Sequence, residues 1–268
     1  MKAYITLLSN SKYLPGVLVL YRSLKDVGAQ FPLFCLLSVS VEKRIEQKLV
    51  DEGIRCVRLT RTAINCEVNP SGKNFSHWNY TFDKLLIWGL TQFEKVVYID
   101  SDMLIVRNID SLFEHKSFSA VSADASYPGN ESWVGGLNSG IVVIKPDKGV
   151  EADLLQSIRP TVEKYKKQGQ LVGDQDVVKS YLSDWGHQTS LHLDEGYNIF
   201  ADHLTYYIRH LGYSLKSDAQ KPIYVIHFIG KTKPWGKKTI REYIWLIRMC
   251  LKNPYYVIAY NRFMKYLK

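Results

Sequence analysis

The sequence predicts an α/β protein with a mostly parallel central sheet flanked by helices, and two observations support this class. Strand-like and helix-like segments alternate from residue 3 to residue 59, which is the pattern of parallel strands joined by crossover helices. Residues 96–99, Val-Val-Tyr-Ile, form an apolar run without a polar break. Such a run is typical of a strand buried on both faces of a parallel sheet.

The first part of the chain contains three predicted strands and two predicted helices. Leu14, Val17, Leu18, Tyr21 and Leu24 recur at helical spacing, and a polar turn precedes them. A second helix has a solvated face of charged residues and ends before Gly53. The expected strands are 3–8, 33–37 and 55–59, and the expected helices are 14–28 and 41–51.

The middle and late parts of the chain are less regular. Residues 60–78 lack periodicity and predict a long loop, and such loops often have functional roles. Further helices are expected at 81–92, 151–167 and 177–182. Further strands are expected at 96–99, 118–123, 141–144 and 224–228.

Two carboxylates follow the apolar run directly, because residues 100–102 read Asp-Ser-Asp. Ligands of open α/β sheets bind beyond the carboxyl ends of the strands, so this pair lies where chemistry is expected. Two carboxylates this close repel each other unless a cation neutralises them or one stays protonated. The alternative is a solvated turn, since Asp and Ser both favour turns.

His227 lies at the end of the last predicted strand and is a candidate third ligand beside Asp100 and Asp102. Two carboxylates and one imidazole suit an ion such as Mn²⁺ that keeps positions open for phosphates. A hydrogen-bonded core histidine is the alternative. Gly230 and Lys233 follow closely and could contact phosphate.

Two polar residues next to predicted elements each allow two interpretations. Asn10 follows the first strand and could bind a base or ribose, or could form a simple turn. Asp174 precedes a helix and could be its N-cap or a residue of the site.

Taken together, the ordered motifs resemble glycosyltransferase family 8, the family of glycogenin and the bacterial lipopolysaccharide galactosyltransferases. The resemblance runs from Ala3 to Trp235 and is most specific in its last stretch, His-Phe-Ile-Gly-Lys-Thr-Lys-Pro-Trp. The motifs that carry it are Thr6-Leu7-Leu8-Ser9-Asn10 with Tyr13, Lys84, Asp100-Ser101-Asp102, Asn108-Ile109-Asp110, Asn138-Ser139-Gly140, Gly173-Asp174-Gln175 and His227 to Trp235.

This resemblance implies a GT-A fold that transfers a hexose from a UDP-sugar with retention of anomeric configuration. It implies Mn²⁺ as the cofactor, held by Asp100, Asp102 and His227. The implied donor-binding residues are Leu7, Ser9, Asn10 and Tyr13 for uracil and ribose, Gly230 and Lys233 for the diphosphate, and Lys84, Ser101, Asp124 and Asn138 around the donor and its sugar. Asp174 and Gln175 are the implied catalytic pair, with attack from the same face and double displacement both left open.

The sequence also departs from glycogenin. Leu171 stands where glycogenin has an acid three residues before its Asp-Gln pair, and Tyr206 and Tyr207 lie only near the region of its glucosylated tyrosine. We therefore expect a separate acceptor, a glycan or lipid-linked saccharide, with a self-glucosylating primer as the alternative.

The end of the chain differs in composition from the rest. Residues 237–268 contain eight Lys or Arg residues and one acid, Glu242, which gives a net charge of +7, and the first 236 residues carry +2. We expect a catalytic domain at 1–236 and a tail of two short helices at 237–268, separated at Asn253-Pro254. Mixed aromatic and basic residues suit an interfacial anchor on an anionic membrane, and a helical cap packed on the body is the alternative.

Composition and cysteine content suggest where the protein works. Four cysteines without C-x-x-C spacing favour reduced thiols, and no apolar stretch approaches the length of a membrane span. The N-terminal apolar run is too short for a signal peptide. We expect a cytoplasmic protein, peripheral on the inner membrane face if the tail binds lipid. A nucleic-acid-binding protein that uses the basic tail is the non-enzyme alternative, and the near-neutral body makes nucleic acid an unexpected partner.

Overall fold

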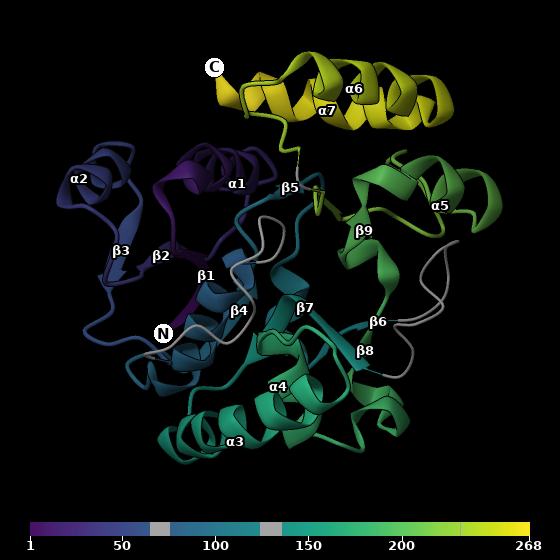
Figure 1. Cartoon of the computed structure of the whole chain (residues 1–268). Coiled ribbons are helices and arrows are strands. Elements are labelled where there is room, and N and C mark those ends of the chain that lie inside the picture. Colours follow the sequence, from purple (N-terminus) through teal and green to yellow (C-terminus); the bar gives the residue numbers. More distant parts are fainter. Residues whose placement is uncertain (65–75, 124–135, 231) are drawn as a thin grey trace.

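The computed structural model describes residues 1–64, 76–123, 136–230 and 232–268. Its main sheet has seven strands in the order β3-β2-β1-β4-β7-β6-β8 (Figure 1). β7 runs antiparallel to both of its neighbours, and the other pairings are parallel, so the predicted mostly parallel sheet is confirmed. The strands are β1 (Lys2–Leu8), β2 (Leu33–Leu37), β3 (Arg55–Arg58), β4 (Lys95–Ile99), β6 (Ala120–Ala123), β7 (Gly136–Ile144) and β8 (His192–Leu193).

Helices cover both faces of this sheet. One face packs against α1 (Leu14–Asp26) and α2 (Lys43–Asp51), and the other packs against the 3-10 helix η2 (Ser76–Gly89), α3 (Lys148–Lys167) and α4 (Asp174–Tyr181). Alternate residues of β4 therefore enter different cores: Val96 and Tyr98 face α3, whereas Val97 and Ile99 face α1. The prediction that this strand is buried on both faces is confirmed.

A second, three-stranded sheet joins distant parts of the chain. It consists of β5 (Met103–Ile105), β10 (Val225–His227) and β9 (Ile199–Phe200), in the order β5-β10-β9. β5 follows the Asp-Ser-Asp turn, and β10 runs antiparallel to it with His227 paired to Met103. This pairing brings His227 next to the turn that contains the two carboxylates.

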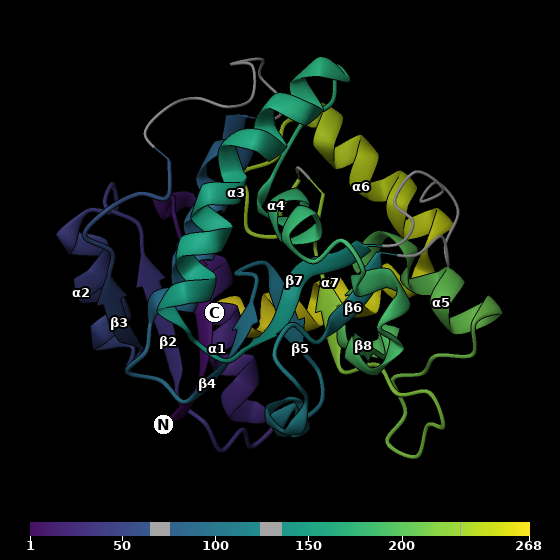
Figure 2. The ribbon, with the colours of Figure 1, turned by 90° about the horizontal axis from the view of Figure 1, so that it is seen from below.

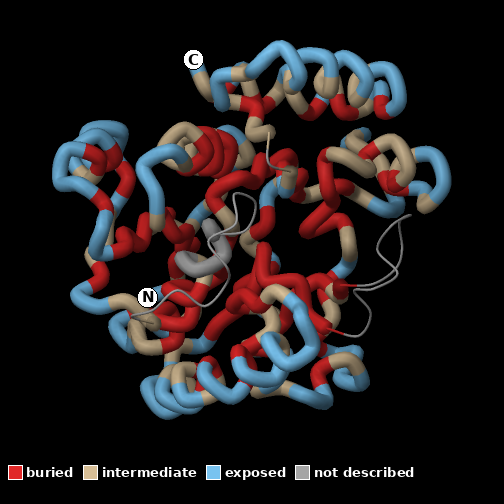
Figure 3. The backbone as a smooth tube through the Cα atoms, in the orientation of Figure 1, coloured by how far each residue is buried: buried red, intermediate tan, exposed pale blue. Residues whose placement is uncertain are grey.

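The two C-terminal helices, α6 (Ile240–Lys252) and α7 (Pro254–Leu267), form a hairpin across the α1 side of the molecule (Figures 1 and 2). Their break at Asn253-Pro254 is the predicted one. α7 has a buried face toward the body, whereas α6 has no buried residue (Figure 3). The buried residues of α7 join a core with residues of β5, β9 and β10. No helix among the described residues is long and apolar enough to cross a membrane.

Several boundaries differ from the expected ones. The strand expected at 118–123 begins at Ala120, because Phe118 has a positive φ of 67°. The strand expected at 141–144 begins at Gly136, so Asn138-Ser139-Gly140 lies inside β7. The helix expected at 177–182 begins at Asp174, and the one expected at 81–92 is the 3-10 helix η2. Short elements were not predicted: β5, β8, β9, α5 (Leu204–His210), and the 3-10 turns Trp185–His187, Thr189–Leu191, Glu195–Tyr197 and Ala201–His203. The 3-10 turn Ser11–Tyr13 lies at the polar turn expected before the first helix, and Asp110–Glu114 lies at a turn expected over residues 108–113.

Candidate active site

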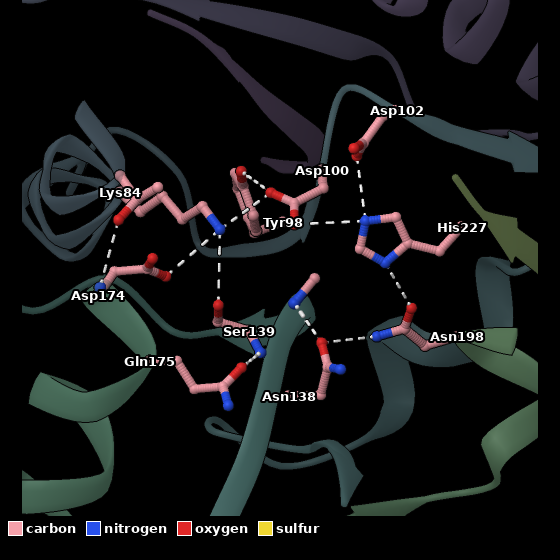
Figure 4. Close-up of polar contacts among 12 residues, drawn as sticks. Lys84, Tyr98, Asp100, Asp102, Asn138, Ser139, Asp174, Gln175, Asn198 and His227 are labelled. Carbon is pink, nitrogen blue, oxygen red and sulfur yellow. Dashed lines mark hydrogen bonds and ion pairs between the residues drawn. The ribbon is translucent and has the colours of Figure 1, made fainter. Parts of the chain in front are cut away.

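Asp100, Asp102 and His227 form a compact group beyond the carboxyl end of β4 (Figure 4). Each offers one ligand atom, and the three atoms lie within 4.8 Å of one another. His227 Nε2 is 3.1 Å from Asp102 Oδ1 and 3.8 Å from Asp100 Oδ2. Asp102 and His227 are only 8% and 6% exposed. The Asp-Ser-Asp segment is thus a buried turn and not a solvated one.

Lys233 neutralises part of this acidic group. Its ammonium lies 2.6 Å from Asp102 Oδ2 and donates to the Phe228 carbonyl at 2.6 Å. Burial alone would raise the pKa of Asp102, but the Lys233 ammonium beside it holds that pKa well below its usual value. Burial would likewise lower the pKa of Lys233, yet Asp102 keeps that pKa above its usual value. Both groups are therefore charged at neutral pH.

Lys84 joins the Asp-Ser-Asp turn to the helix α4. Its ammonium is 2.9 Å from Asp100 and 3.3 Å from Asp174, both in ion pairs. Burial would lower the pKa of Lys84, but these two carboxylates raise it above its usual value. Asp100 also accepts a hydrogen bond of 2.6 Å from the Tyr98 hydroxyl. The cation thus lies between a predicted metal ligand and a predicted catalytic residue.

β7 supplies the third side of the site. Ser139 Oγ is 3.5 Å from Lys84 Nζ, and its backbone N–H donates to Gln175 Oε1 at 3.1 Å. Asn138 Oδ1 accepts from Asn198 Nδ2 at 2.8 Å, and Asn198 Oδ1 lies 2.9 Å from His227 Nδ1. A continuous set of polar contacts therefore links α4, β7, the Asp-Ser-Asp turn and β10.

The residues predicted to bind uracil and ribose lie at the adjacent end of β1. Tyr13 lies beside the far end of the chain, with its ring 5.7 Å from Lys233 Nζ and 5.8 Å from the Trp235 ring. Asn10 Oδ1 accepts from the Lys12 N–H at 2.9 Å, so the turn role considered for Asn10 is present. Leu7 is buried in the core, and Ser9 accepts a hydrogen bond from Ser40 through its carbonyl.

The remaining predicted residues are placed as follows. Ser101 is buried inside the turn, and Gly230 follows β10 beside Asp202. Asp174 is not an N-cap, because Gly173 occupies that position and Asp174 is the first residue of α4. The alternative interpretation of Asp174 was therefore wrong. Asp124 lies outside the described residues.

Two residues of this network were not predicted. Tyr98 belongs to the apolar run of β4. The only indication of its contact in the sequence is its position two residues before Asp100, because residues i and i+2 of a strand point to the same face. Asn198 precedes β9, a two-residue strand, and is 3% exposed. Nothing in the residues around Asn198 indicates that it contacts Asn138 and His227.

The donor set fits a divalent cation. Carboxylate oxygens and one imidazole nitrogen are ligands for Mn²⁺ and related ions, and the described ligands leave further coordination positions open. Gly140 contributes space, because a Cβ there would lie 3.0 Å from His227 Cε1 and 3.0 Å from Asn198 Nδ2. The close approach of β7 to the ligand histidine thus requires glycine.

Comparison with known proteins identifies the class of enzyme. The chain is 31% identical over 240 residues to glycogenin-1 of Caenorhabditis elegans, which covers 87% of this chain and 51% of that protein. It is 28% identical over 239 residues to a putative UDP-glucuronate:xylan α-glucuronosyltransferase 3 of Arabidopsis thaliana, covering 87% of this chain and 34% of that protein. The chain thus spans about half or less of these relatives.

Solved structures support the fold. The galactosyltransferase LgtC, crystallised with donor and acceptor sugar analogues, superposes with a TM-score of 0.65 at 16% identity, covering 100% of this chain and 95% of that one. The glycosyltransferase GlyE of Streptococcus pneumoniae TIGR4 superposes with a TM-score of 0.60 at 19% identity, covering 100% and 64%. The fold is therefore GT-A-like. The family model of glycosyl transferase family 8 matches residues 4–239, and the chain belongs to this family of glycosyltransferases.

Proposed function

We propose that this glycosyltransferase moves a hexose from a UDP-sugar to a separate saccharide acceptor, with a divalent metal, Mn²⁺, and with retention of anomeric configuration. The observation that carries the proposal is the buried group of Asp100, Asp102 and His227 with Lys233 beside it. A metal at these three residues would supply Lewis-acid stabilisation of the diphosphate leaving group.

The positive charge of Lys233 suits the same leaving group. As the bond from the sugar to the diphosphate breaks, negative charge grows on the diphosphate, and a fixed cation stabilises this charge more than that of the ground state. Lys233 is held on the loop after β10 by the Phe228 carbonyl, and its neighbour Gly230 leaves the backbone accessible. Tyr13 beside Lys233 supports a nucleoside site at the end of β1.

Asp174 and Gln175 are the proposed residues at the reacting centre. Gln175 is a neutral amide and a poor nucleophile. Asp174 is 5% exposed and paired with Lys84, so its charge is already engaged. This pairing favours an orienting role for Asp174 and attack of the acceptor from the face that the diphosphate leaves. Trapping of a glycosylated Asp174 would instead establish double displacement.

The test measures UDP release from a panel of UDP-sugars with and without Mn²⁺. Asp102→Asn keeps the side-chain volume and removes the charge that a metal needs, so release is expected to fall at least about 100-fold, roughly 2.7 kcal/mol of barrier. Asp153→Asn, an exposed position on α3, is the control and keeps wild-type release. The proposal would be contradicted if chelation of the metal did not change UDP release by the wild type, or if Asp102→Asn released UDP as fast as the wild type.

Self-glucosylation remains the alternative for the acceptor. Tyr207 is 4% exposed, which does not suit an open acceptor, whereas Tyr206 is only half-buried, with its ring against His210 at 4.8 Å. Intact-mass measurement after incubation with UDP-glucose separates the two cases, because a self-glucosylating primer gains successive hexose masses.

We also propose that α6 binds an anionic membrane surface, which would bring the enzyme to a lipid-linked acceptor. One face of α6 exposes an apolar stripe at helical spacing: Ile240, Tyr243, Ile244, Ile247 and Leu251, between 45% and 80% exposed. Arg241, Arg248 and Lys252 lie along one flank of the stripe. Apolar and basic residues on one helix suit the interface of an anionic bilayer.

The test is binding to vesicles with and without phosphatidylserine. Ile244→Glu with Ile247→Glu is expected to abolish sedimentation with anionic vesicles. Val50→Glu, at an exposed apolar position on α2, is expected to leave it unchanged. Substitution is preferable to deletion of the tail, because α7 contributes to the core. Equal binding by all three proteins would contradict a membrane role for α6.

A further inference from the structure

The two ring nitrogens of His227 have different neighbours. Nε2 faces the carboxylates of Asp102 and Asp100, whereas Nδ1 lies 2.9 Å from Asn198 Oδ1. A histidine binds a metal through a nitrogen that carries no proton, so ligation through Nε2 requires the proton on Nδ1. The nearby Asp102 carboxylate favours the opposite arrangement, because Nε2–H could donate to it. Something else must therefore select the tautomer that binds metal.

The polarity of the hydrogen bonds can be followed from a backbone amide. The Gly140 N–H can only donate, and it lies 3.0 Å from the Asn138 side chain, so the atom it meets is the oxygen Oδ1. That oxygen must be met by a donor from Asn198, which is Nδ2 at 2.8 Å. Asn198 consequently turns its oxygen toward His227, and a carbonyl oxygen can only accept. The chain of contacts ends with a proton on Nδ1.

The fold explains why this amide is available. In the β6–β7 pairing, Ala120 is opposite Val142 but Val121 is opposite Asn138, so β7 bulges between these positions. The bulge contains Gly140, whose carbonyl accepts from the Asp100 N–H at 2.9 Å and whose N–H turns to Asn138. Bulges often occur next to active sites, where they redirect a side chain.

Burial protects the arrangement from competition by water. Asn138, Asn198 and His227 are 8%, 3% and 6% exposed. In such surroundings each polar atom needs a partner, and reversing one amide would place two oxygens or two donors against each other. The two amides and the Nδ1–H of His227 therefore have one satisfied orientation.

We propose that Asn198 is a positioning residue which, through Asn138 and the Gly140 N–H, keeps the proton of His227 on Nδ1 and leaves the Nε2 lone pair facing Asp100 and Asp102. This inference rests on the proposed metal-dependent transfer. Asn138 thereby acquires a role in addition to its expected place beside the donor sugar. Residues that orient a metal-binding histidine typically change metal affinity about 10- to 100-fold when replaced.

The first test reads the tautomer directly. Long-range ¹H–¹⁵N correlation NMR of the metal-free protein at pH 9 distinguishes a protonated from an unprotonated ring nitrogen. Wild type is expected to show His227 with Nδ1 protonated and Nε2 bare, and Asn198→Leu, of similar volume, is expected to gain the Nε2–H form. A wild-type ring protonated on Nε2 would overturn the proposal without any variant having to fold.

The second test measures Mn²⁺ affinity from the electron paramagnetic resonance signal of the free ion. Asn198→Leu is expected to weaken the Kd at least about 10-fold. Asn138→Asp keeps an oxygen that accepts from both the Gly140 N–H and Asn198 Nδ2, so it is expected to stay within about threefold of wild type, which a general packing defect would not produce. Thr161→Val removes a buried hydroxyl from α3 and is expected to leave both the Kd and the His227 spectrum unchanged.

The outcomes separate the two proposals. Wild type that binds no Mn²⁺ contradicts the proposed function, and the NMR result then still decides the tautomer. If wild type and Asn198→Leu bind Mn²⁺ with the same Kd and give the same His227 spectrum, the proposed role of Asn198 is wrong. The proposed function is then unaffected.

Discussion

At the scale of single residues, Lys84 shows how charge is balanced inside the site. It is a buried cation between two carboxylates, Asp100 and Asp174, and the pKa of Lys84 is raised accordingly, against the effect of burial. Removing one partner of a buried ion pair leaves the other charge uncompensated, which typically costs 3–5 kcal/mol. Exposed pairs contribute far less.

Lys84→Met is therefore expected to lower the free energy of unfolding by about 3 kcal/mol at pH 7. Without the cation, the buried Asp174 and its neighbour Asp100 are left as two like charges that repel each other. Urea unfolding at pH 7 measures the loss. Lys2→Met, which removes the exposed pair with Glu114, is the control and should cost less than about 1 kcal/mol. An equal loss in both variants would contradict the assignment.

Asn198 shows what a sequence cannot reveal at this scale. Asp100, Asp102 and His227 could be predicted because they lie at the carboxyl ends of apolar runs that form strands. Asn198 contacts Asn138 at a separation of 60 residues, and no local pattern carries that contact. Its orientation depends on a bulge, and a bulge is a property of strand pairing that neither strand encodes alone.

At the scale of elements, α1 supports the Asp-Ser-Asp turn by direct contact. Gly16 lies in the first turn of this helix, and a Cβ there would overlap the Ser101 carbonyl oxygen and come within 2.9 Å of Trp235 Cη2. The helix, the Asp-Ser-Asp turn and the loop after β10 therefore meet at a residue without a side chain.

Gly16→Ala is expected to displace the turn, weaken Mn²⁺ binding at least about 10-fold and cost about 1–3 kcal/mol of stability, as overpacking does. Metal titration and urea unfolding measure the two effects. Gly149→Ala, a helical glycine of α3 whose added Cβ would meet its nearest neighbour at 3.1 Å, provides the comparison and should retain wild-type metal binding. Wild-type metal binding by Gly16→Ala would show that the turn tolerates movement.

The elements also mark the limit of prediction by periodicity. β1, β2, β4, α1 and α3 could be predicted because their apolar residues repeat over many positions. β5, β8 and β9 contain two or three residues, too few for a repeat, and they exist because a neighbouring strand pairs with them. The three-stranded sheet that positions His227 was therefore missed, although His227 itself was identified.

At the scale of the whole molecule, α7 links the C-terminal helices to the site. Phe263 is fully buried and contacts Phe228 edge-to-face at 5.0 Å and the Trp235 ring by stacking at 5.5 Å. These two aromatic residues bracket the loop that carries Lys233. The cap considered for the tail is therefore present in α7, whereas α6 is exposed and its membrane role stays a prediction.

Phe263→Ala is expected to lower the free energy of unfolding by about 3–5 kcal/mol, the usual cost of a large aromatic cavity, and to weaken UDP binding because Phe228 and Trp235 lose their support. Urea unfolding and calorimetric titration with UDP measure these effects. Ile258→Ala, at an exposed position of the same helix, should change neither. A loss of stability with unchanged UDP affinity would separate α7 from the loop.

Ionisation of buried tyrosines is expected to lower the stability of the protein at alkaline pH. Burial, with nearby carboxylates such as Asp100 next to Tyr98, raises the pKa of Tyr4, Tyr98 and Tyr256 above the usual value near 10. Raised pKa values in the folded state mean that the unfolded chain loses these protons first, so the stability that these three tyrosines contribute is complete below pH 10 and falls as the pH rises further.

These three tyrosines are expected to lower the free energy of unfolding by about 3 kcal/mol between pH 10 and pH 11, about 1 kcal/mol for each. Urea unfolding at half-unit steps of pH measures the slope, and Tyr256→Phe should make it shallower by one group. A stability curve that stays flat through this range would show that the phenols ionise freely in the folded protein.

The pairing of β5 with β10 has a consequence for the chain as a polymer. Asp102 and His227 are 125 residues apart in sequence and 3.1 Å apart in space. An ion bound by both would act as a reversible cross-link over nearly half of the chain, and ligands that bind only the folded state add about 2.7 kcal/mol of stability at 100 times their Kd. Binding of the ion should therefore raise the unfolding temperature and slow proteolysis. Both quantities can be measured before a substrate is known.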